Sequence, residues 1–332
     1  MVEMNRREFL SCVTSTAALV VAGGCRTCVA ERDANLAVFL SDMHISGRKM
    51  GEPGVEEWMC PTYHHEKLRA VVDEILAMRP RPAKCICFGD LAHDRGCDAD
   101  YEASYAILKP LEDAGIEIVH GLGNHDHREP FFRKYPGYAK RTPVPGRVVS
   151  VVEFPQCDII MMDTLQEHLE PEWGGWNAVG GTLDEEQRAW LSRELPKRSR
   201  PFFLASHHPI QELWIRPKSE TDKKGLRLDK FLVRECPRCA GYIHGHNHAW
   251  TTDWVMNDWG KPGMLRTLCL PSTGHWGDIG WTSFRMSEQA AVARLHLREF
   301  YFPHPVKAGE KRPWEWDEIV AEKTGSVCTF KY

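Results

Sequence analysis

A polar turn that directly follows an apolar run is the feature of this sequence that most restricts its fold. The run Ile116–Val119 predicts a strand with alternating faces, and Gly121–Asp126 follows it with the sequence Gly-Leu-Gly-Asn-His-Asp. The two glycines allow the backbone to turn sharply where the strand ends. The turn presents an amide, an imidazole and a carboxylate together, which suits metal binding or acid–base chemistry. A polar loop that closes a strand explains one such turn equally well, but four more predicted strands end in similar groups.

Those four strands and the polar residues after them complete the pattern. They are 36–41 followed by Asp42 and His44, 84–89 by Asp90, 201–206 by His207, and 241–245 by His246 and His248. Alternate residues of an extended chain point the same way, so Asp42 and His44 can bind one ion. The chain has 16 histidines, and more than half lie in or beside these five turns. Scattered core or surface histidines do not gather in this way, so the clustering indicates a metal or acid–base site.

Periodicity predicts helices between the first three strands. Apolar residues recur every three or four positions over 62–79, which Pro80 ends, and again over 98–114. A strand–helix–strand–helix–strand order indicates a sheet of parallel strands covered by helices. In such sheets, active groups gather at the carboxyl ends of the strands.

The second half of the sequence predicts further elements. A hairpin is expected over 148–154 and 158–162, a helix over 183–195, and strands of a second sheet over 265–270 and 293–302. Thr182, with Glu185 three residues later, indicates a capping box at the start of that helix.

Length and charge restrict the function. A chain of 332 residues easily builds a large core, and no Pro/Ser/Gly-rich linker interrupts its middle, so one large domain is expected over 31–302, with a C-terminal extension over 303–332. The net charge of -4 does not indicate the basic surface that binds duplex nucleic acid, so such a partner is not expected.

Residues 1–30 are predicted to be an export signal and not to form part of the folded domain. The segment Asn5–Leu10 resembles the twin-arginine export motif of bacteria, a route that carries folded proteins. The apolar stretch over 12–22 is shorter than the roughly 17–25 residues that span a bilayer. We expect an exported, periplasmic or otherwise extracytoplasmic protein. Cleavage after Ala30 and lipid anchoring at Cys25 both fit the sequence, and membrane association is expected only through such an anchor.

Two pairs of cysteines have informative spacing. Cys85 and Cys87 lie on one face of a predicted strand and are expected to be buried small hydrophobic residues. Cys236 and Cys239 have the spacing of a metal hook, but no second pair lies at zinc-ribbon distance. A local disulfide or two free thiols therefore suits them better than a structural zinc site.

In their order and on this framework, the five turns resemble those of the calcineurin-like metallophosphoesterases. The quoted motifs are Asp42-x-His44, Gly89-Asp90, Gly123-Asn124-His125-Asp126, His207 and Gly245-His246-x-His248. The segment 181–191 also resembles the Gln-x-x-Trp-Leu helix of the branch with class III cyclic-nucleotide phosphodiesterases and purple acid phosphatases. The resemblance implies an α/β fold, a four-layer α/β/β/α sandwich of two mixed sheets flanked by helices.

The resemblance also implies a role for each donor. One ion is expected at Asp42, His44, Asp90 and His248, and a second at Asp90, Asn124, His207 and His246. The donors are oxygen and imidazole without thiolate, which suits iron, manganese or zinc. Two such ions, about 3.5 to 4 Å apart, acidify a bridging water, and the resulting hydroxide attacks phosphorus.

The resemblance gives the rest of the glycine-rich turn a catalytic role. His125 is expected to contact the phosphoryl oxygen or to protonate the leaving group, with Asp126 orienting it.

The sequence departs from purple acid phosphatases at one position. His93 replaces their tyrosine three residues after the bridging Asp90, so a tyrosine–iron site is not supported, and His93 is expected near the ligands or as an extra ligand. His208 suits two roles equally well: support of the neighbouring ligand His207, or a turn residue before Pro209. His244 is expected to pack beneath the site.

Aromatic residues offer a hypothesis about substrate. Several tryptophans fall in predicted loops and could stack a nucleobase, although each one singly is more typical of a core residue. They are Trp173, Trp176, Trp214, Trp250, Trp254 and Trp276. Among the loops, Gly274–Gly277 is the best candidate for substrate contact.

The leading hypothesis is therefore a metal-dependent phosphoric ester hydrolase that cleaves small-molecule phosphate mono- or diesters. A catalytically silent scaffold on the same fold is the alternative, although all seven ligand positions carry suitable residue types. A thiol redox protein using Cys236 and Cys239 is a third hypothesis, but these cysteines follow a helical segment and do not open one.

Overall fold

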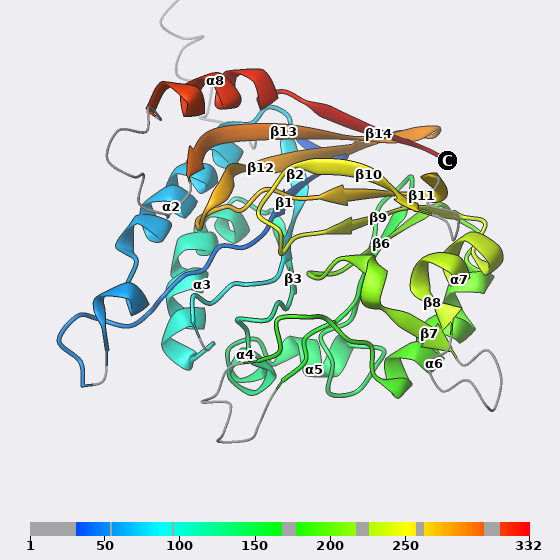
Figure 1. Ribbon diagram of the computed structural model, residues 1–332, viewed down its shortest axis with the longest axis horizontal. Helices are drawn as coiled ribbons and strands as arrows, with labels where there is room; N and C mark the ends of the chain where they lie inside the picture. The colour runs from blue at the N-terminus through cyan, green and yellow to red at the C-terminus, as the bar shows by residue number, and fades with distance from the viewer. Residues whose placement is uncertain are drawn as a thin grey trace, which may run out of the picture.

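Two six-stranded sheets lie face to face, and helices cover the outer face of each (Figure 1). The computed structural model describes residues 31–53, 55–94, 96–167, 177–216, 226–256, 262–301 and 313–332. The expected α/β/β/α sandwich of two mixed sheets is confirmed. The expected export signal over 1–30 lies outside the described residues.

The first sheet contains the three strands predicted at the start of the chain. Its spatial order is β14 (Val327–Lys331), β13 (Ala290–Tyr301), β12 (Gly277–Met286), β1 (Arg32–Leu40), β2 (Arg81–Phe88) and β3 (Glu117–Gly121). Strands β1, β2 and β3 are parallel because the helices α2 (Thr62–Ala77) and α3 (Asp98–Asp113) cross over between them, as predicted. The other three strands extend the sheet in antiparallel fashion.

One assignment to a sheet was wrong. Strand β13 was expected in a second sheet, but it lies in the first sheet beside β12, which itself pairs with β1. Strand β12 was not predicted, because its ten residues are buried along most of their length and show no clean alternation.

The second sheet contains the strands that carry the later motifs. Its spatial order is β10 (Thr251–Met256), β11 (Pro262–Cys269), β9 (Cys239–His244), β6 (Phe202–Ala205), β5 (Asp158–Met161) and β4 (Ser150–Glu153). Strands β4 and β5 form the predicted hairpin, and β5, β6, β9 and β11 run parallel. The helices α6 (Glu185–Glu194) and α7 (Leu228–Glu235) lie on the side of this sheet away from α2 and α3 (Figure 1).

The remaining elements are short or peripheral. They are η1 (Glu57–Met59), α4 (Arg128–Lys134), α5 (Gly137–Arg141), η3 (Leu195–Lys197), η4 (Ile210–Glu212), β7 (Trp214–Arg216), β8 (Leu226–Arg227) and α8 (Pro313–Lys323). Helix α8 packs on β13 at the edge of the first sheet (Figure 1). Within the described ranges, every helix falls short of the length and apolar character needed to cross a bilayer.

The start of α6 differs from the predicted capping box. The N-cap is Asp184, whose side chain accepts a hydrogen bond from the backbone N–H of Gln187 at 2.8 Å, so the helix begins two residues after the expected Thr182. Gln187 in turn ties the helix to the end of β5. Its Oε1 accepts from the Asp163 N–H at 2.9 Å and its Nε2 donates to the Asp163 carbonyl at 2.7 Å.

The core has three apolar layers because the central strands are buried on both faces. In β1, Ala37 and Phe39 face the layer between the sheets, whereas Val38 and Leu40 face the layer beneath α2 and α3. A third layer lies beneath α6 and α7. Burial of one such large side chain stabilises the fold by about 1.5–3 kcal/mol, so these layers hold the strand ends in fixed positions. The predicted burial of the thiols on β2 is confirmed, since both are fully inaccessible to solvent.

Candidate metal centre

The predicted donor residues meet where the strands of the two sheets end. Asp42 and Asp90 follow β1 and β2 in the first sheet, and His246 follows β9 in the second. The turns after β1 and β9 are joined directly, because the backbone N–H of His246 donates to both carboxylate oxygens of Asp42, at 3.2 and 3.1 Å. The carboxyl ends of these strands therefore bring predicted donors from both sheets together.

The two aspartates are the centre of the cluster. The Nε2 atom of His248 lies 3.1 Å from Asp42 Oδ1. A single oxygen of Asp90, Oδ2, lies 3.2 Å from Nε2 of His207 and 3.5 Å from Nε2 of His44. Each of these side chains is almost fully buried, so the contacts form in a water-poor interior. Asp90 thus faces one imidazole from each of the two expected ligand sets.

The other two predicted ligands adjoin this centre. The Nδ1 atom of His246 lies 3.2 Å from Nε2 of His207. Asn124 immediately precedes His125, whose backbone N–H donates to Asp90 Oδ1 at 2.8 Å. Within the described residues, the buried Oδ1 atom of Asn124 and both ring nitrogens of His44 have no hydrogen-bond partner. A buried polar atom without a partner is costly, and metal coordination removes that cost.

The backbone at the site is unusual. Five non-glycine residues in the described ranges have a positive φ, and all five are predicted ligands. They are Asp42 (52°), His44 (48°), Asp90 (49°), His246 (70°) and His248 (52°). Non-glycine residues rarely adopt this conformation, and such strained residues cluster at functional sites.

Two glycines of the motifs are required by close approach. A Cβ atom on Gly123 would lie 2.2 Å from Asp90 Oδ1, and one on Gly245 would lie 2.7 Å from Asp42 Oδ2. Any side chain at either position would push a carboxylate away from the cluster. The glycines next to the donors therefore allow the turns to pack against the two aspartates.

The charges of the site favour a cation. Burial raises the pKa of a carboxyl group, yet attraction to His207 and His125 holds the pKa of Asp90 well below its usual range. Burial is likewise overcome at Asp42, whose pKa is lowered by His248 and His207. The same carboxylates outweigh the burial of His207 and raise its pKa to about 9. Two buried carboxylates thus create a negative potential that stabilises a proton or a metal ion.

His207 is also oriented as a ligand. Its Nδ1 atom lies 2.9 Å from the carbonyl oxygen of Phe88 and donates to it, because a carbonyl can only accept. The other nitrogen, Nε2, therefore faces Asp90 and Asp42, where it can donate a proton to the carboxylates or, once deprotonated, bind a metal ion. A backbone carbonyl that fixes the tautomer in this way is typical of metal-binding histidines.

The two predicted catalytic residues have different surroundings. The ring of His125 lies beside that of His44, with centroids 4.7 Å apart. Asp126 is fully buried, and its carboxylate accepts from the backbone N–H groups of Gly123, Leu91 and Ala92 at 2.9–3.3 Å. Burial, together with repulsion from Asp90, raises the pKa of Asp126 to about 6. Through these hydrogen bonds the Asp126 carboxylate connects the turn after β2 with the turn after β3. The sequence did not predict this role.

Two residues that hold the glycine-rich turn were missed. The Tyr101 hydroxyl donates to Asp126 Oδ1 at 3.2 Å, from helix α3. The side chain of Asn177 donates to the carbonyls of Asn124 and Asp126 at 2.9 and 2.8 Å. Neither residue lies in a motif, and their contacts join positions 25 to 53 residues apart, so no local signal in the sequence indicates them.

The remaining histidines of the motifs surround the donors. His208 packs beside His246, and its Nδ1 lies 2.8 Å from the Thr164 hydroxyl. His244 is buried, and its Nδ1 lies 2.9 Å from the carbonyl oxygen of Gly245. The ring of His93 lies 6.1 Å from that of His44.

The tryptophans proposed for substrate contact differ in burial and in their distance from the site. Trp250 is buried in the layer between the sheets, whereas Trp254 is exposed on β10. Trp276 packs against His248, with ring centroids 4.5 Å apart, so the loop Gly274–Gly277 reaches the site. Trp173 and Trp176 lie outside the described residues.

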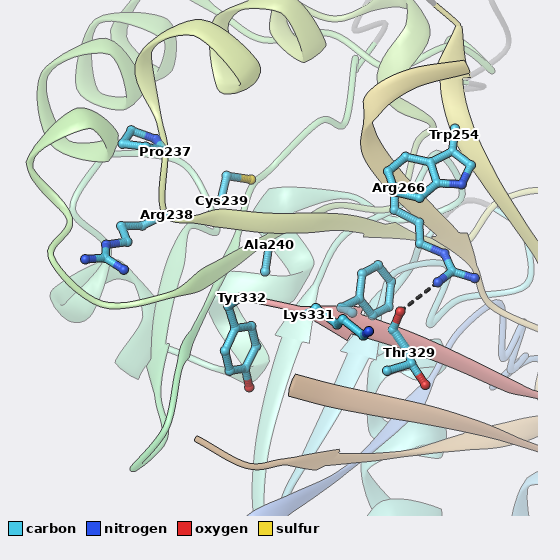
Figure 2. A pocket seen from close by; sticks show the side chains of 10 residues that line it. Pro237, Arg238, Cys239, Ala240, Trp254, Arg266, Thr329, Lys331 and Tyr332 are labelled. Atoms are coloured by element: carbon cyan, nitrogen blue, oxygen red, sulfur yellow. Dashed lines mark hydrogen bonds between the residues drawn. The ribbon is translucent and has the colours of Figure 1, made fainter. Parts of the chain in front are cut away.

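A separate cavity of about 510 Å³ lies at the start of β9 (Figure 2). It is lined by three cations, Arg238, Arg266 and Lys331, and Arg266 donates to the Thr329 carbonyl at 2.6 Å. Cys239 begins β9 here, whereas the metal donors follow the other end of the strand, about 17 Å away at roughly 3.3 Å per residue. Among the described residues that line this cavity, no side chain carries a carboxylate or an imidazole, which are the donors that the predicted chemistry uses.

Cys236 and Cys239 are both free thiols. Of the two alternatives expected from the sequence, a local disulfide and a pair of free thiols, the structure has the second. Cys236 is buried at the end of α7, and burial raises the pKa of Cys239 to about 12. A thiol with a raised pKa is a poor nucleophile at neutral pH, which argues against redox chemistry at this pair.

Comparison with known proteins agrees with the geometry. A family model described as calcineurin-like phosphoesterase matches residues 37–250, which include all seven donors. A probable cyclic nucleotide phosphodiesterase from Rhodopseudomonas palustris is 32% identical over 181 residues. That match covers 54% of this chain and 59% of the relative, so it spans less than two thirds of the relative's length.

Two solved structures share the fold. A dimetal phosphatase from Danio rerio has a TM-score of 0.56 at 15% identity, over 79% of this chain and 96% of that one. The structure of PhoD has a TM-score of 0.52 at 12% identity, over 82% of this chain and 67% of that one. Since the family model matches more than half of its length, the chain belongs to the calcineurin-like phosphoesterase family.

Proposed function

We propose that this protein is a dinuclear-metal phosphoesterase that hydrolyses small-molecule phosphate mono- or diesters. One observation carries the proposal: Asp90 Oδ2 lies within 3.5 Å of a ring nitrogen from each of two imidazoles, His44 and His207. An oxygen shared by two sets of donors suits a bridging ligand between two ions.

The two sets of donors fit two ions. Asp42, His44 and His248 lie close enough to hold one ion, and Asp42, Asp90 and His207 form a second such group. Asn124 and His246 complete the second set in our assignment, and the buried Oδ1 of Asn124 supports its role as a ligand. The oxygen and imidazole donors favour iron, manganese or zinc.

Each part of the site has a task in the proposed reaction. Two ions held by these donors would act as Lewis acids toward phosphate oxygens and would lower the pKa of a bound water. His125, next to His44, donates a proton to the leaving oxygen or a hydrogen bond to the phosphoryl group. Asp126 and Asn177 hold the backbone on either side of His125, so that its ring keeps its place.

We favour phosphodiesters, and cyclic nucleotides among them, as the substrate class. The relative from Rhodopseudomonas palustris is described as a probable cyclic nucleotide phosphodiesterase, which supports this choice. Trp276, which packs on His248, offers an aromatic face on which a nucleobase can stack.

A screen of model substrates tests the proposal. Purified protein with added manganese should hydrolyse bis(4-nitrophenyl) phosphate and at least one cyclic nucleotide faster than 4-nitrophenyl phosphate. Asp90→Asn should lose this activity, because it removes the bridging charge. His296→Ala should keep it, since His296 stacks on Trp281 outside the donor groups. Absence of turnover with manganese, iron and zinc on every substrate contradicts the proposal.

We further propose that residues 1–30 direct export, ahead of a domain over 31–302 and an extension over 303–332. The Asn5–Leu10 motif supports a twin-arginine route to an extracytoplasmic location, with lipid attachment at Cys25 as one possible outcome. Replacement of Arg6 and Arg7 by lysine should retain the protein in the cytoplasm of a bacterial host. Unchanged export of that variant contradicts this route.

A further inference from the structure

Three more histidines form a cluster that adjoins the predicted donors, since the ring of His275 lies 4.2 Å from that of His44 by centroid. His64 lies in the first turn of α2, His93 follows β2, and His275 precedes β12. Each offers a ring nitrogen within 4.8 Å of those of the other two. The same criterion groups the donors of the dinuclear centre, yet none of these three histidines belongs to that ligand set.

The tautomer of His64 leaves a lone pair inside the cluster. Its Nδ1 lies 2.7 Å from the carbonyl oxygen of His44 and must donate to it, because the carbonyl can only accept. The neutral ring therefore has an unprotonated Nε2, which lies 3.3 Å from Nδ1 of His275. Metal-binding histidines typically donate their other ring N–H to a carbonyl in this way.

The separation of these two nitrogen atoms matches a shared ion. Two Zn–N bonds of about 2.0–2.1 Å at a tetrahedral angle place the nitrogens roughly 3.3–3.4 Å apart. A hydrogen bond from His275 to His64 gives a similar distance, and the metal content of the protein distinguishes the two. The third ring, that of His93, lies 5.2 and 5.7 Å from the rings of His64 and His275 by centroid.

Backbone hydrogen bonds fix the other two histidines in place. The backbone N–H of His275 donates to the Ser272 hydroxyl at 2.8 Å, and that hydroxyl donates to the Asp42 carbonyl at 2.9 Å. The backbone N–H of His93 donates to the Ile45 carbonyl at 3.1 Å. The cluster is therefore built on the same turn that carries the first ligands, and its geometry does not depend on an exposed loop.

A glycine next to the cluster permits this packing. A Cβ atom on Gly274 would lie 2.5 Å from the carbonyl oxygen of Met43, so a side chain there would displace the loop that carries His275. His64 itself is fully buried. Among the three, His64 thus places an unprotonated ring nitrogen in the interior, which suits a site for a cation.

We propose that His64, His93 and His275 bind a third divalent ion, chemically distinct from the dinuclear centre because its ligands are imidazoles alone. Three imidazoles suit zinc or another late first-row metal, and they leave a coordination position for water or an anion such as a phosphate oxygen. The ion would also restrain His44, since His64 holds the carbonyl of that residue. The proposal goes beyond the dinuclear hydrolase and does not require it to be active.

Metal content provides the test. The full chain is equilibrated with excess zinc, desalted, and measured by mass spectrometry of the metal, with circular dichroism as a check of the fold. Wild type should retain three ions per chain. His93→Ala and His275→Ala should each retain two, and His296→Ala, which removes a half-buried imidazole outside the cluster, should retain three. Neither His93 nor His275 is fully buried, so both variants should fold, and each tests the site independently.

Equal metal content in wild type and in both cluster variants overturns the proposal.

One further variant separates this proposal from the proposed function. Asp90→Asn disrupts the dinuclear centre but leaves the three histidines in place, so it should keep the ion that His93→Ala loses. If wild type binds one ion, which His93→Ala loses and Asp90→Asn keeps, the third site is supported and the dinuclear hydrolase is not. If wild type binds two ions, both retained by His93→Ala, the third site is overturned and the dinuclear centre is supported.

Discussion

At the scale of single residues, backbone strain coincides with the predicted metal donors. A non-glycine residue in the left-handed region costs of the order of 1–3 kcal/mol, and in the described ranges this strain occurs only at five predicted ligands. The surrounding layers of apolar side chains hold those turns in place. The turns therefore keep their shape because the fold around them is stable, and the shape brings the donors together.

Gly123 tests how tightly that shape is required. A Cβ atom there would lie 2.2 Å from Asp90 Oδ1, so Gly123→Ala should displace the bridging carboxylate and weaken metal affinity by about 10- to 100-fold. Isothermal titration with manganese measures the effect. Gly137→Ala in α5 is the matched control, because its nearest heavy atom would lie 3.8 Å from the new Cβ. Wild-type affinity in Gly123→Ala would show that the close approach is not needed.

His125 tests the proton transfer. Its removal in His125→Ala should lower kcat by roughly 10²- to 10⁴-fold while the metal content stays unchanged. The loss should be larger for an alkyl phosphodiester than for a 4-nitrophenyl ester, because nitrophenolate leaves without help from an acid. His296→Ala serves as the control. A loss of the same size for both esters would leave His125 with a binding role only.

At the scale of elements, the Gln-x-x-Trp-Leu helix has a structural explanation. Gln187 satisfies both backbone groups of Asp163 at the end of β5, while Trp190 and Leu191 pack into the layer beneath α6. The motif therefore fixes the helix against the strand. None of the motif's residues is among the predicted metal ligands. The role of the motif is therefore structural, although it resembles a motif of hydrolases.

Gln187→Ala should destabilise the fold by about 2–4 kcal/mol, because it leaves a buried N–H and a buried carbonyl of Asp163 without partners. Urea unfolding at neutral pH measures the change. The exposed Gln289→Ala should shift the free energy of unfolding by less than about 0.5 kcal/mol. Similar stabilities for the two variants would contradict the role given to Gln187.

Most elements were predicted because their patterns are local. Helix α2 carries apolar residues at regular spacing, and β1 is a continuous apolar run, so each was identified from its own residues. Strand β12 was missed, and β13 was placed in the wrong sheet, because the choice of partner strand depends on contacts distant in sequence. The predicted donors could be proposed from sequence because all of them follow strand ends, whereas His64 lies inside a helix and nothing nearby distinguishes it.

At the scale of the whole molecule, a buried ion-pair network joins the two sheets. Arg128, which begins α4 after β3 of the first sheet, forms two hydrogen bonds of 2.8 Å to Asp163, which follows β5 of the second. The same guanidinium donates to Glu167 Oε2 at 2.6 Å. Removal of Arg128 would leave the buried carboxylate of Asp163 without its cationic partner, so the network should stabilise the packing of the two sheets.

The network predicts a defined pH dependence. Burial opposes ionisation of Glu167, but His127 and Arg128 lower its pKa from 4.5 to about 2. A lowered folded-state pKa contributes stability that is full above pH 4.5 and is lost as the pH falls toward 2. Glu167→Gln should therefore be about 1–2 kcal/mol less stable than wild type at pH 7, allowing for solvent screening, and equally stable near pH 2.

Thermal unfolding across this pH range measures the difference. Glu129→Gln is the control, because Glu129 lies on the surface with its side chain 87% exposed. A difference between wild type and Glu167→Gln that stays constant from pH 7 to pH 2 would contradict the assignment of the lowered pKa to Glu167.

Anomalous diffraction from crystals grown with manganese tests the central claim most directly. The account predicts two peaks that flank the carboxylate of Asp90, about 3.5 to 4 Å apart, with Asp42, His44 and His248 around one and Asn124, His207 and His246 around the other. Ordered side chains in these positions with no manganese peak beside Asp90, or with a single one, would contradict it.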